Sequence, residues 1–125
     1  MQSSVKRKTM SKILKIVFSF FIFQNLSAQS AAALEVQARK TADKREKMTL
    51  LYKAAERYLG TNPDKASQLS HQAYIIANED LKDYTMATRT AFLNAEGYAR
   101  QKEWSNAKFR YNRSKESALK ANDMD

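Results

Sequence analysis

The chain contains no cysteine, one histidine, one proline and two glycines among its 125 residues. Without cysteine it has no disulfide, no thiolate nucleophile, no soft metal ligand and no thiol for a lipid anchor. So few turn-forming residues leave little material for β-hairpins or a glycine-rich phosphate loop. Beyond the first thirty residues, Ala, Lys, Glu, Gln, Leu and Met dominate, and these side chains lose little rotamer freedom in a helix. The sequence therefore predicts one all-α domain.

The net charge of +9 is concentrated at the amino terminus. The basic residues that precede the first acidic one are Lys6, Arg7, Lys8, Lys12 and Lys15. When the first 28 residues are set aside, 17 basic and 13 acidic side chains remain, which gives a net charge of +4. This balance is ordinary for a protein surface, so no nucleic-acid partner is expected.

The amino-terminal segment has the three-part order of a secretory signal. Residues 1–15 are basic, residues 16–23 are apolar, and residues 26–28 read Leu-Ser-Ala ahead of Gln29. The apolar run is shorter than the ~20 residues that a membrane-spanning helix needs. We therefore expect residues 1–28 to be a signal peptide and the mature protein to be exported, either periplasmic or secreted. A buried core helix or an uncleaved anchor is the alternative interpretation.

Apolar side chains recur at helical spacing over residues 48–59, which predicts a helix. The preceding residues 29–47 are helix-permissive but rich in charge, so we expect either a charged linker or an extension of this helix. Gly60 follows the last periodic residue. We expect it to end the helix in the left-handed conformation, which glycine adopts most easily.

Three more helices are predicted downstream. Asn62 and Pro63 supply an N-cap and a ring-fixed first position for a second helix, which runs to about Asp80. Asp83 is a suitable N-cap for a third helix. Residues 101–103 then separate the third helix from a fourth.

The four helices pair as two stacked helix-turn-helix hairpins, residues 48–80 and residues 83–122, in one helical domain. A shift of the chain by 41 positions places Leu51 on Phe92, Ala54 on Ala95, Ala66 on Ala107 and Ala77 on Ala118. A fixed period of this size is typical of stacked helical hairpins.

Residues of the second hairpin resemble the tetratricopeptide repeat motif. The motif contains a tyrosine, a second aromatic residue, a small residue and a third aromatic residue at fixed spacings. This chain has the same spacings at Tyr98, Trp104, Ala107 and Tyr111. In the first hairpin, Ala66 and Ala73 resemble the small residues of a preceding copy of the motif. The chain is similar in this respect to exported bacterial members of the family, and to the amino-terminal repeat region of sensor and signalling proteins.

Some positions depart from the family pattern, and the period exceeds the usual ~34 residues. The departing residues are Arg57, Asn94, Ala95 and Ser114. An unrelated four-helix domain with alanine-rich faces is therefore the alternative architecture, and it is also all-α.

The resemblance implies a short α-solenoid whose first helices line a concave groove for a peptide. When the groove-facing spacings are carried onto this chain, the candidate groove residues are Met48, Leu51, Ala55, Tyr58, Arg89, Phe92, Glu96 and Ala99. Such a groove would suit an amphipathic peptide. Leu51 and Phe92 are equally compatible with core positions.

A basic stripe is predicted on the fourth helix. Residues 100–120 hold seven basic side chains and two acidic ones. At 100° per residue, Arg110, Arg113 and Lys120 share the face opposite Trp104 and Tyr111. The stripe could contact an anionic membrane surface, an acidic partner or an envelope polymer, and an ordinary solvated face is the alternative.

The sequence offers few groups for catalysis or metal binding. His71 is the only histidine, so a metal site or a Ser-His relay within one chain would have to manage with a single imidazole. Glu79, Asp80 and Asp83 are close in sequence but lack the alternating acids and the glycine of a calcium loop. We therefore expect no enzyme activity, no cofactor and no metal.

Three functions agree with these features. Two hairpins are fewer than the about three repeats that a stack usually needs, so the core could be completed by self-association or by a partner protein. The first function is thus a stand-alone exported interaction module. The second is the truncated sensory region of a longer signal-transduction protein, and the third is an envelope-associated structural protein held by its apolar segment and basic stripe.

Export is tested by amino-terminal sequencing of protein recovered from the cell envelope or the medium. We expect the mature chain to begin near Gln29, because the signal peptidase site follows the apolar segment. Intact Met1 on protein from the cytosol would contradict export.

Overall fold

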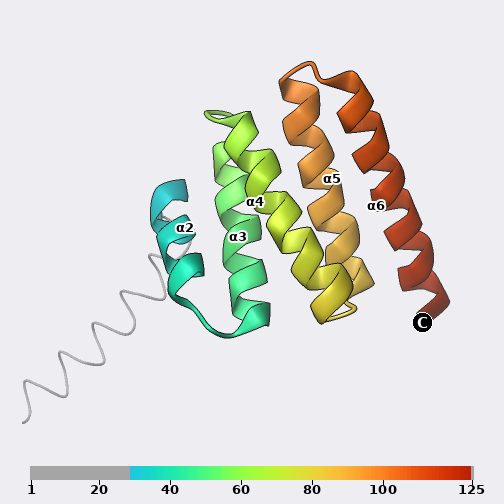
Figure 1. Ribbon diagram of the computed structural model, residues 1–125, viewed down its shortest axis with the longest axis horizontal. Helices are drawn as coiled ribbons and strands as arrows, with labels where there is room; N and C mark the ends of the chain where they lie inside the picture. Colours follow the sequence, from blue (N-terminus) through green and yellow to red (C-terminus); the bar gives the residue numbers. More distant parts are fainter. Residues whose placement is uncertain (1–28, 125) are drawn as a thin grey trace, which may run out of the picture.

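The computed structural model describes residues 29–124, and over this range it is built from helices without any strand (Figure 1). The helices are α2 (Ala31–Lys40), α3 (Lys44–Tyr58), α4 (Pro63–Ile75), the π-helical turn η1 (Ile76–Asp80), α5 (Tyr84–Arg100) and α6 (Trp104–Met124). The predicted all-α fold class is therefore confirmed. The expected signal peptide, residues 1–28, lies outside the described residues.

The helices form a row in chain order, from α2 at one edge to α6 at the other (Figure 1). Each helix runs opposite to the one before it, and the connecting loops alternate between the lower and the upper ends of the helices in this view. α3 also contacts α5, the next α-helix but one. Between residues 29 and 124, no helix is long and apolar enough to cross a membrane.

Side-chain caps begin each of the first four α-helices. Ser30, Asp43, Asn62 and Asp83 each accept a hydrogen bond from the backbone N–H three residues further on. Such a bond satisfies one of the donors that a helix start leaves unpaired. The predicted caps Asn62 and Asp83 are confirmed.

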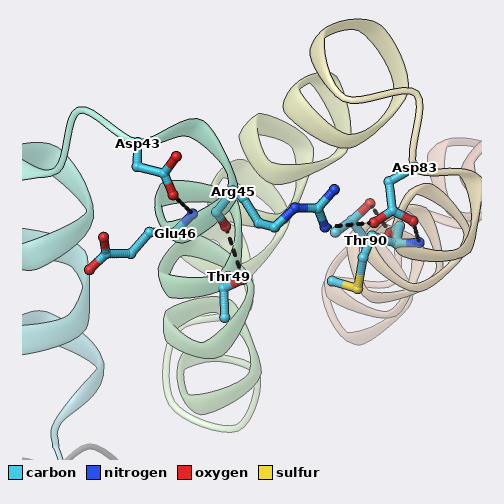
Figure 2. Close-up of polar contacts among 7 residues, drawn as sticks. Asp43, Arg45, Glu46, Thr49, Asp83 and Thr90 are labelled. Carbon is cyan, nitrogen blue, oxygen red and sulfur yellow. Dashed lines mark hydrogen bonds and ion pairs between the residues drawn. The ribbon is translucent and has the colours of Figure 1, made fainter.

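The caps Asp43 and Asp83 lie 40 residues apart and start α3 and α5 in the same way. Arg45 of α3 donates from Nη1 to Oδ2 of Asp83 at 2.9 Å, as Figure 2 shows. One carboxylate thus caps α5 and ties its start to α3. This ion pair holds the starts of α3 and α5 next to each other.

Of the interval 29–47, expected to be a charged linker or a helix extension, residues 44–47 do extend the predicted helix as the start of α3, but the rest is not a linker. It contains the separate helix α2, and residues 41–43 divide α2 from α3. Leu34 and Ala38 of α2 are fully buried and join the core. Only these two apolar side chains, four positions apart, face inward, and the surrounding charges hid so narrow a stripe in the sequence pattern.

Gly60 does not adopt the left-handed conformation that the sequence suggested. No described glycine has a positive φ, whereas Lys82 and Lys102 have φ values of 49° and 61°. The left-handed residues thus lie in the turns before α5 and α6. At Gly60 the chain turns differently: Leu59 still has helical angles, and the backbone N–H of Asn62 bonds to the carbonyl of Tyr58.

Small aliphatic side chains build the core. The central cluster consists of Leu34, Ala38, Met48, Leu50, Leu51, Ala54, Ala55, Leu69, Ala73, Ile76, Ala77, Ala87 and Leu93. Alanines hold little apolar area, so the helices must approach closely to exclude water.

α4 and α5 approach each other closely at Gly97. A Cβ added to Gly97 would lie 2.9 Å from the carbonyl oxygen of Pro63 and 2.9 Å from Cβ of Ser67. Beside this contact, Nδ2 of the buried Asn94 donates to the carbonyl of Ser67 at 2.6 Å. A residue without a side chain and a polar cross-link therefore fix the spacing between α4 and α5.

A buried carboxylate fastens α2 to the next two helices. Glu35 is 5% exposed, and it accepts hydrogen bonds from Lys65 of α4 at 2.8 Å, from Tyr58 of α3 at 3.0 Å and from Arg39 at 2.6 Å. Burial alone would raise the pKa of Glu35. The hydrogen bonds from Lys65 and Tyr58, with the charges of Lys65 and Arg39, outweigh burial and lower this pKa below its ordinary 4.5.

The variant Gly97→Ala tests the close approach of α4 and α5. We expect it to destabilise the fold by about 1–3 kcal/mol, because the new methyl group meets backbone atoms that cannot rotate away. Urea denaturation of residues 29–125 measures the change. The matched control is Gly60→Ala, which has nothing within 4 Å of the new Cβ and should not destabilise the fold. Equal stability of the two variants would contradict the packing.

The variant Glu35→Gln tests the buried carboxylate. At pH 7 we expect a loss of about 2 kcal/mol, typical of hydrogen bonds to a charged group. The folded pKa of Glu35 is lowered, so its stabilisation is fully present above the unfolded pKa near 4.5 and fades as the pH falls through the folded pKa. The difference between wild type and variant should therefore shrink in acid.

Denaturation at a series of pH values measures this dependence. The control is Glu56→Gln, which removes an exposed carboxylate from α3. A pH-independent difference between wild type and Glu35→Gln would show that the charge of Glu35 is not what stabilises α2.

Candidate functional site

The structure divides the predicted partner groove between core and surface. Met48, Leu51 and Ala55 are at most 2% exposed and pack in the core that α2 also joins. They cannot touch a peptide, and this half of the predicted groove is corrected. Tyr58 is partly buried and bonded to Glu35, so its hydroxyl is already occupied.

The α5 half of the predicted groove remains accessible. Arg89 is exposed, Phe92 is 50% exposed, and Glu96 and Ala99 are partly exposed. The helix periodicity places Arg89, Phe92 and Glu96 on one side of α5. Of the eight predicted groove residues, these are the ones that a partner can reach together.

Phe92 and Tyr111 form an aromatic pair across α5 and α6. Their ring centroids are 5.4 Å apart with an interplanar angle of 63°, an edge-to-face contact. The hydroxyl of Tyr111 donates to Oε1 of Glu96 at 2.6 Å. Burial, this hydrogen bond and the charge of Glu96 raise the pKa of Tyr111 to about 12, so Tyr111 remains a neutral donor at physiological pH.

Trp104 extends this surface towards the start of α6. It is 65% exposed and precedes Tyr111 by seven residues, which places both on the same flank of the helix. We call Phe92, Trp104 and Tyr111 the aromatic face. Phe92 and Trp104 are half exposed or more, and Tyr111 is partly exposed.

Exposed large apolar side chains are concentrated in the last two helices. The α5 and α6 examples are Phe92, Trp104, Phe109 and Leu119, and the others are Val36 and Ile75. Single exposed apolar residues are normal, but their accumulation at one end of a molecule is typical of an interaction surface.

The predicted basic stripe is not one solvated row. The guanidinium of Arg110 lies over the rings of Tyr98 and Phe109, at 5.8 and 5.4 Å. That of Arg113 lies over the rings of Tyr74 and Phe109, at 4.8 and 5.2 Å. Both arginines are only partly exposed.

Lys120, the third stripe residue, is separate from the two arginines. It is exposed, and its ammonium lies 5.6 Å from the ring of Tyr84. Two helical turns separate it from Arg113, a distance of about 10 Å along the axis.

His71 of α4 faces Arg110 of α6. Nη1 of Arg110 lies 3.4 Å from Nδ1 of His71. Burial lowers the pKa of His71, and the charges of Arg110 and Arg113 lower it further, whereas Glu79 acts in the opposite direction. We call His71, Arg110 and Arg113 the arginine cluster.

The acidic residues between α4 and α5 serve as ion-pair partners. Asp80 pairs with Lys44 at 3.2 Å, and Asp83 pairs with Arg45 at 2.9 Å. In the described part of the chain, no group of three histidine, cysteine or acidic side chains is placed to hold a metal ion.

The sequence interpretation missed Tyr74 and Phe109, the rings that hold Arg113. Phe109 precedes Arg113 by four positions, a spacing that brings two side chains together on one helix. Tyr74 is three positions after His71 on α4, and only the packing of α4 near α6 brings it to Arg113.

The chain matches no protein-family model, no curated protein and no solved structure in the comparisons with known proteins. The geometry of the aromatic face and of the arginine cluster is therefore the basis for a functional proposal.

Proposed function

We propose that this chain is an exported, non-catalytic interaction module of tetratricopeptide type that binds an amphipathic helix of a protein partner. The partner helix lies against the aromatic face, at the α5–α6 edge of the row. No catalytic residue, metal or cofactor takes part in this function.

The main support is a difference between equivalent positions of the two hairpins. Under the 41-residue shift, Leu51 corresponds to Phe92 and Ser70 corresponds to Tyr111. Leu51 and Ser70 are 2% and 0% exposed, whereas Phe92 is 50% exposed and Tyr111 is partly exposed. Positions that the first hairpin buries are thus open in the second.

The difference follows from the places of the hairpins in the row. α3 contacts α5 of the next hairpin, whereas no described helix follows α6 to contact α5 in the same way. In a repeat array the uncovered edge is complementary to one more helix. A helix of a partner, with apolar residues at i, i+3, i+4 and i+7, would fit such an edge.

The uncovered edge also supports a second candidate function. Further hairpins of a longer chain would cover Phe92 and Tyr111 in the same manner, as expected for the sensory region of a signal-transduction protein. The two candidates differ in whether the covering helix belongs to another molecule.

Photo-crosslinking in the producing cell tests the partner. Benzoylphenylalanine replaces Trp104 on the aromatic face and, as a matched control, exposed Lys53 of α3. We expect one discrete adduct with a second protein from position 104 and none from position 53. An adduct with another copy of the chain would mean self-association, and no adduct from a folded protein would contradict the proposal.

Affinity for the crosslinked partner gives the quantitative test. Truncation of an aromatic anchor at an interface costs about 2 kcal/mol or more, so Trp104→Ala should weaken binding by about thirtyfold or more. Calorimetry measures the dissociation constant. The control Leu119→Ala removes an exposed apolar side chain outside the aromatic face and should change the affinity much less.

A further inference from the structure

The arginine cluster lies on the flank of α6 opposite the aromatic face, and it has features that a helix-binding function does not require. Arg110 and Arg113 occupy neighbouring turns, and the ring of Phe109 lies within 5.4 Å of both guanidinium centres. The guanidinium of Arg110 also lies 5.8 Å from the ring of Tyr98 of α5, and that of Arg113 lies 4.8 Å from the ring of Tyr74 of α4. The rings thereby limit the motion of both positive groups, which share the ring of Phe109.

No carboxylate neutralises these charges within the described chain. The ion pairs found there use Glu35, Asp80 and Asp83, none of which pairs with Arg110 or Arg113. The Nε atom of Arg110 is buried without a hydrogen-bond acceptor. A planar guanidinium has five N–H donors, and here they meet ring faces and one histidine nitrogen instead of oxygen acceptors.

His71 adds a third group that can become positive. The charged groups near His71 are Arg110 and Arg113 from α6 and Glu79 from η1. The tyrosines that contact these arginines are Tyr98 from α5 and Tyr74 from α4. Burial and the two arginines lower the pKa of His71, so the imidazole is neutral at physiological pH. An anion bound between the arginines would offset their repulsion of a proton on His71, the second cause of its lowered pKa after burial.

We propose that His71, Arg110 and Arg113 form a binding site for a phosphate-class oxyanion. Guanidinium forks donate paired hydrogen bonds to tetrahedral oxyanions, and arginines held in place lose little entropy on binding. The distance to Lys120 argues for a compact anion, because an extended acidic segment would need a continuous basic row. The proposal is independent of the aromatic face.

The bound anion and the proton on His71 must favour each other, because binding linkage is reciprocal. The anion raises the pKa of His71, so affinity for the anion increases as the pH falls through the pKa of His71 in the free protein. Sulfate is the suitable probe for this pH series, since it stays doubly charged throughout, whereas phosphate changes its own charge near neutral pH.

The experiment uses the sole histidine of the chain as its reporter. Proton NMR follows the His71 ring signal against pH for the mature protein, alone and with sulfate, and a titration with inorganic phosphate gives the dissociation constant. We expect the anion to raise the pKa of His71. We expect Arg113→Gln to weaken phosphate binding by about tenfold or more, the usual effect of losing a charged hydrogen-bond donor.

The matched control is Lys108→Gln, which removes one positive charge from an exposed position on α6 outside the cluster. It should weaken phosphate binding by less than about twofold. The variant Arg113→Lys keeps the positive charge but loses the paired N–H donors of the guanidinium, so it should bind phosphate more weakly than wild type. It replaces Arg113→Gln in the experiment if that variant does not fold. Equal affinities for the arginine variants and the control, or an unchanged pKa of His71 with sulfate, would overturn the proposal.

Vesicles distinguish the source of the phosphate. Phosphatidylcholine vesicles with and without phosphatidic acid are sedimented with wild type and with the two glutamine variants. Binding to phosphatidic acid that depends on Arg113 but not on Lys108 would assign the site to a lipid headgroup. Binding of inorganic phosphate without vesicle binding would assign it to a soluble phosphate compound.

Discussion

The contact between Gly97 and the first turn of α4 sets the geometry on which the other features depend. Because Gly97 has no side chain, the backbone of α5 comes within van der Waals distance of Pro63 and Ser67. The hydrogen bond from Asn94 to the carbonyl of Ser67 then fixes the alignment of the two helices. This spacing allows alanine-sized side chains to form a dry core, and it brings α6, packed on α5, near enough to α4 for Arg110 to reach His71.

The two edges of the row differ in their chemistry. At the α2 edge, Glu35 connects three helices through bonds to Tyr58 and Lys65, and the core residues there are covered. At the α6 edge, rings and arginines remain partly exposed, with no covering helix in the described chain. We place both proposed interactions on the last hairpin for this reason, one on each flank of α6.

The sequence predicted the helices more successfully than their contacts. Asn62, Pro63 and Asp83 marked helix starts correctly, because a cap acts within three residues of its own position. The predicted groove was half wrong, since the pattern places Met48 and Leu51 on a helix face but does not say whether that face meets solvent. α2 was missed because two inward side chains among many charges make a weak periodic pattern.

The arginine cluster shows the same division between local and distant interactions. Arg110 and Arg113 were recognised as neighbours on one helix face, a property of spacing alone. Their ring contacts with Tyr74 and Tyr98 join residues from three different helices, and no local pattern indicates them. The sequence left a docking surface and an ordinary solvated face open for the basic stripe, and the structure holds two of its members against aromatic rings.

The sequence alone determined that the chain is helical, where most of its helices begin and end, and which residues share a helix face. These properties depend on capping, backbone preference and spacing within a few residues. The tertiary structure decided that α2 joins the core, that Lys82 and Lys102 rather than Gly60 are left-handed, and that His71 meets Arg110. Those outcomes depend on which helices pack together, because residues tens of positions apart interact only after the packing has brought them into contact.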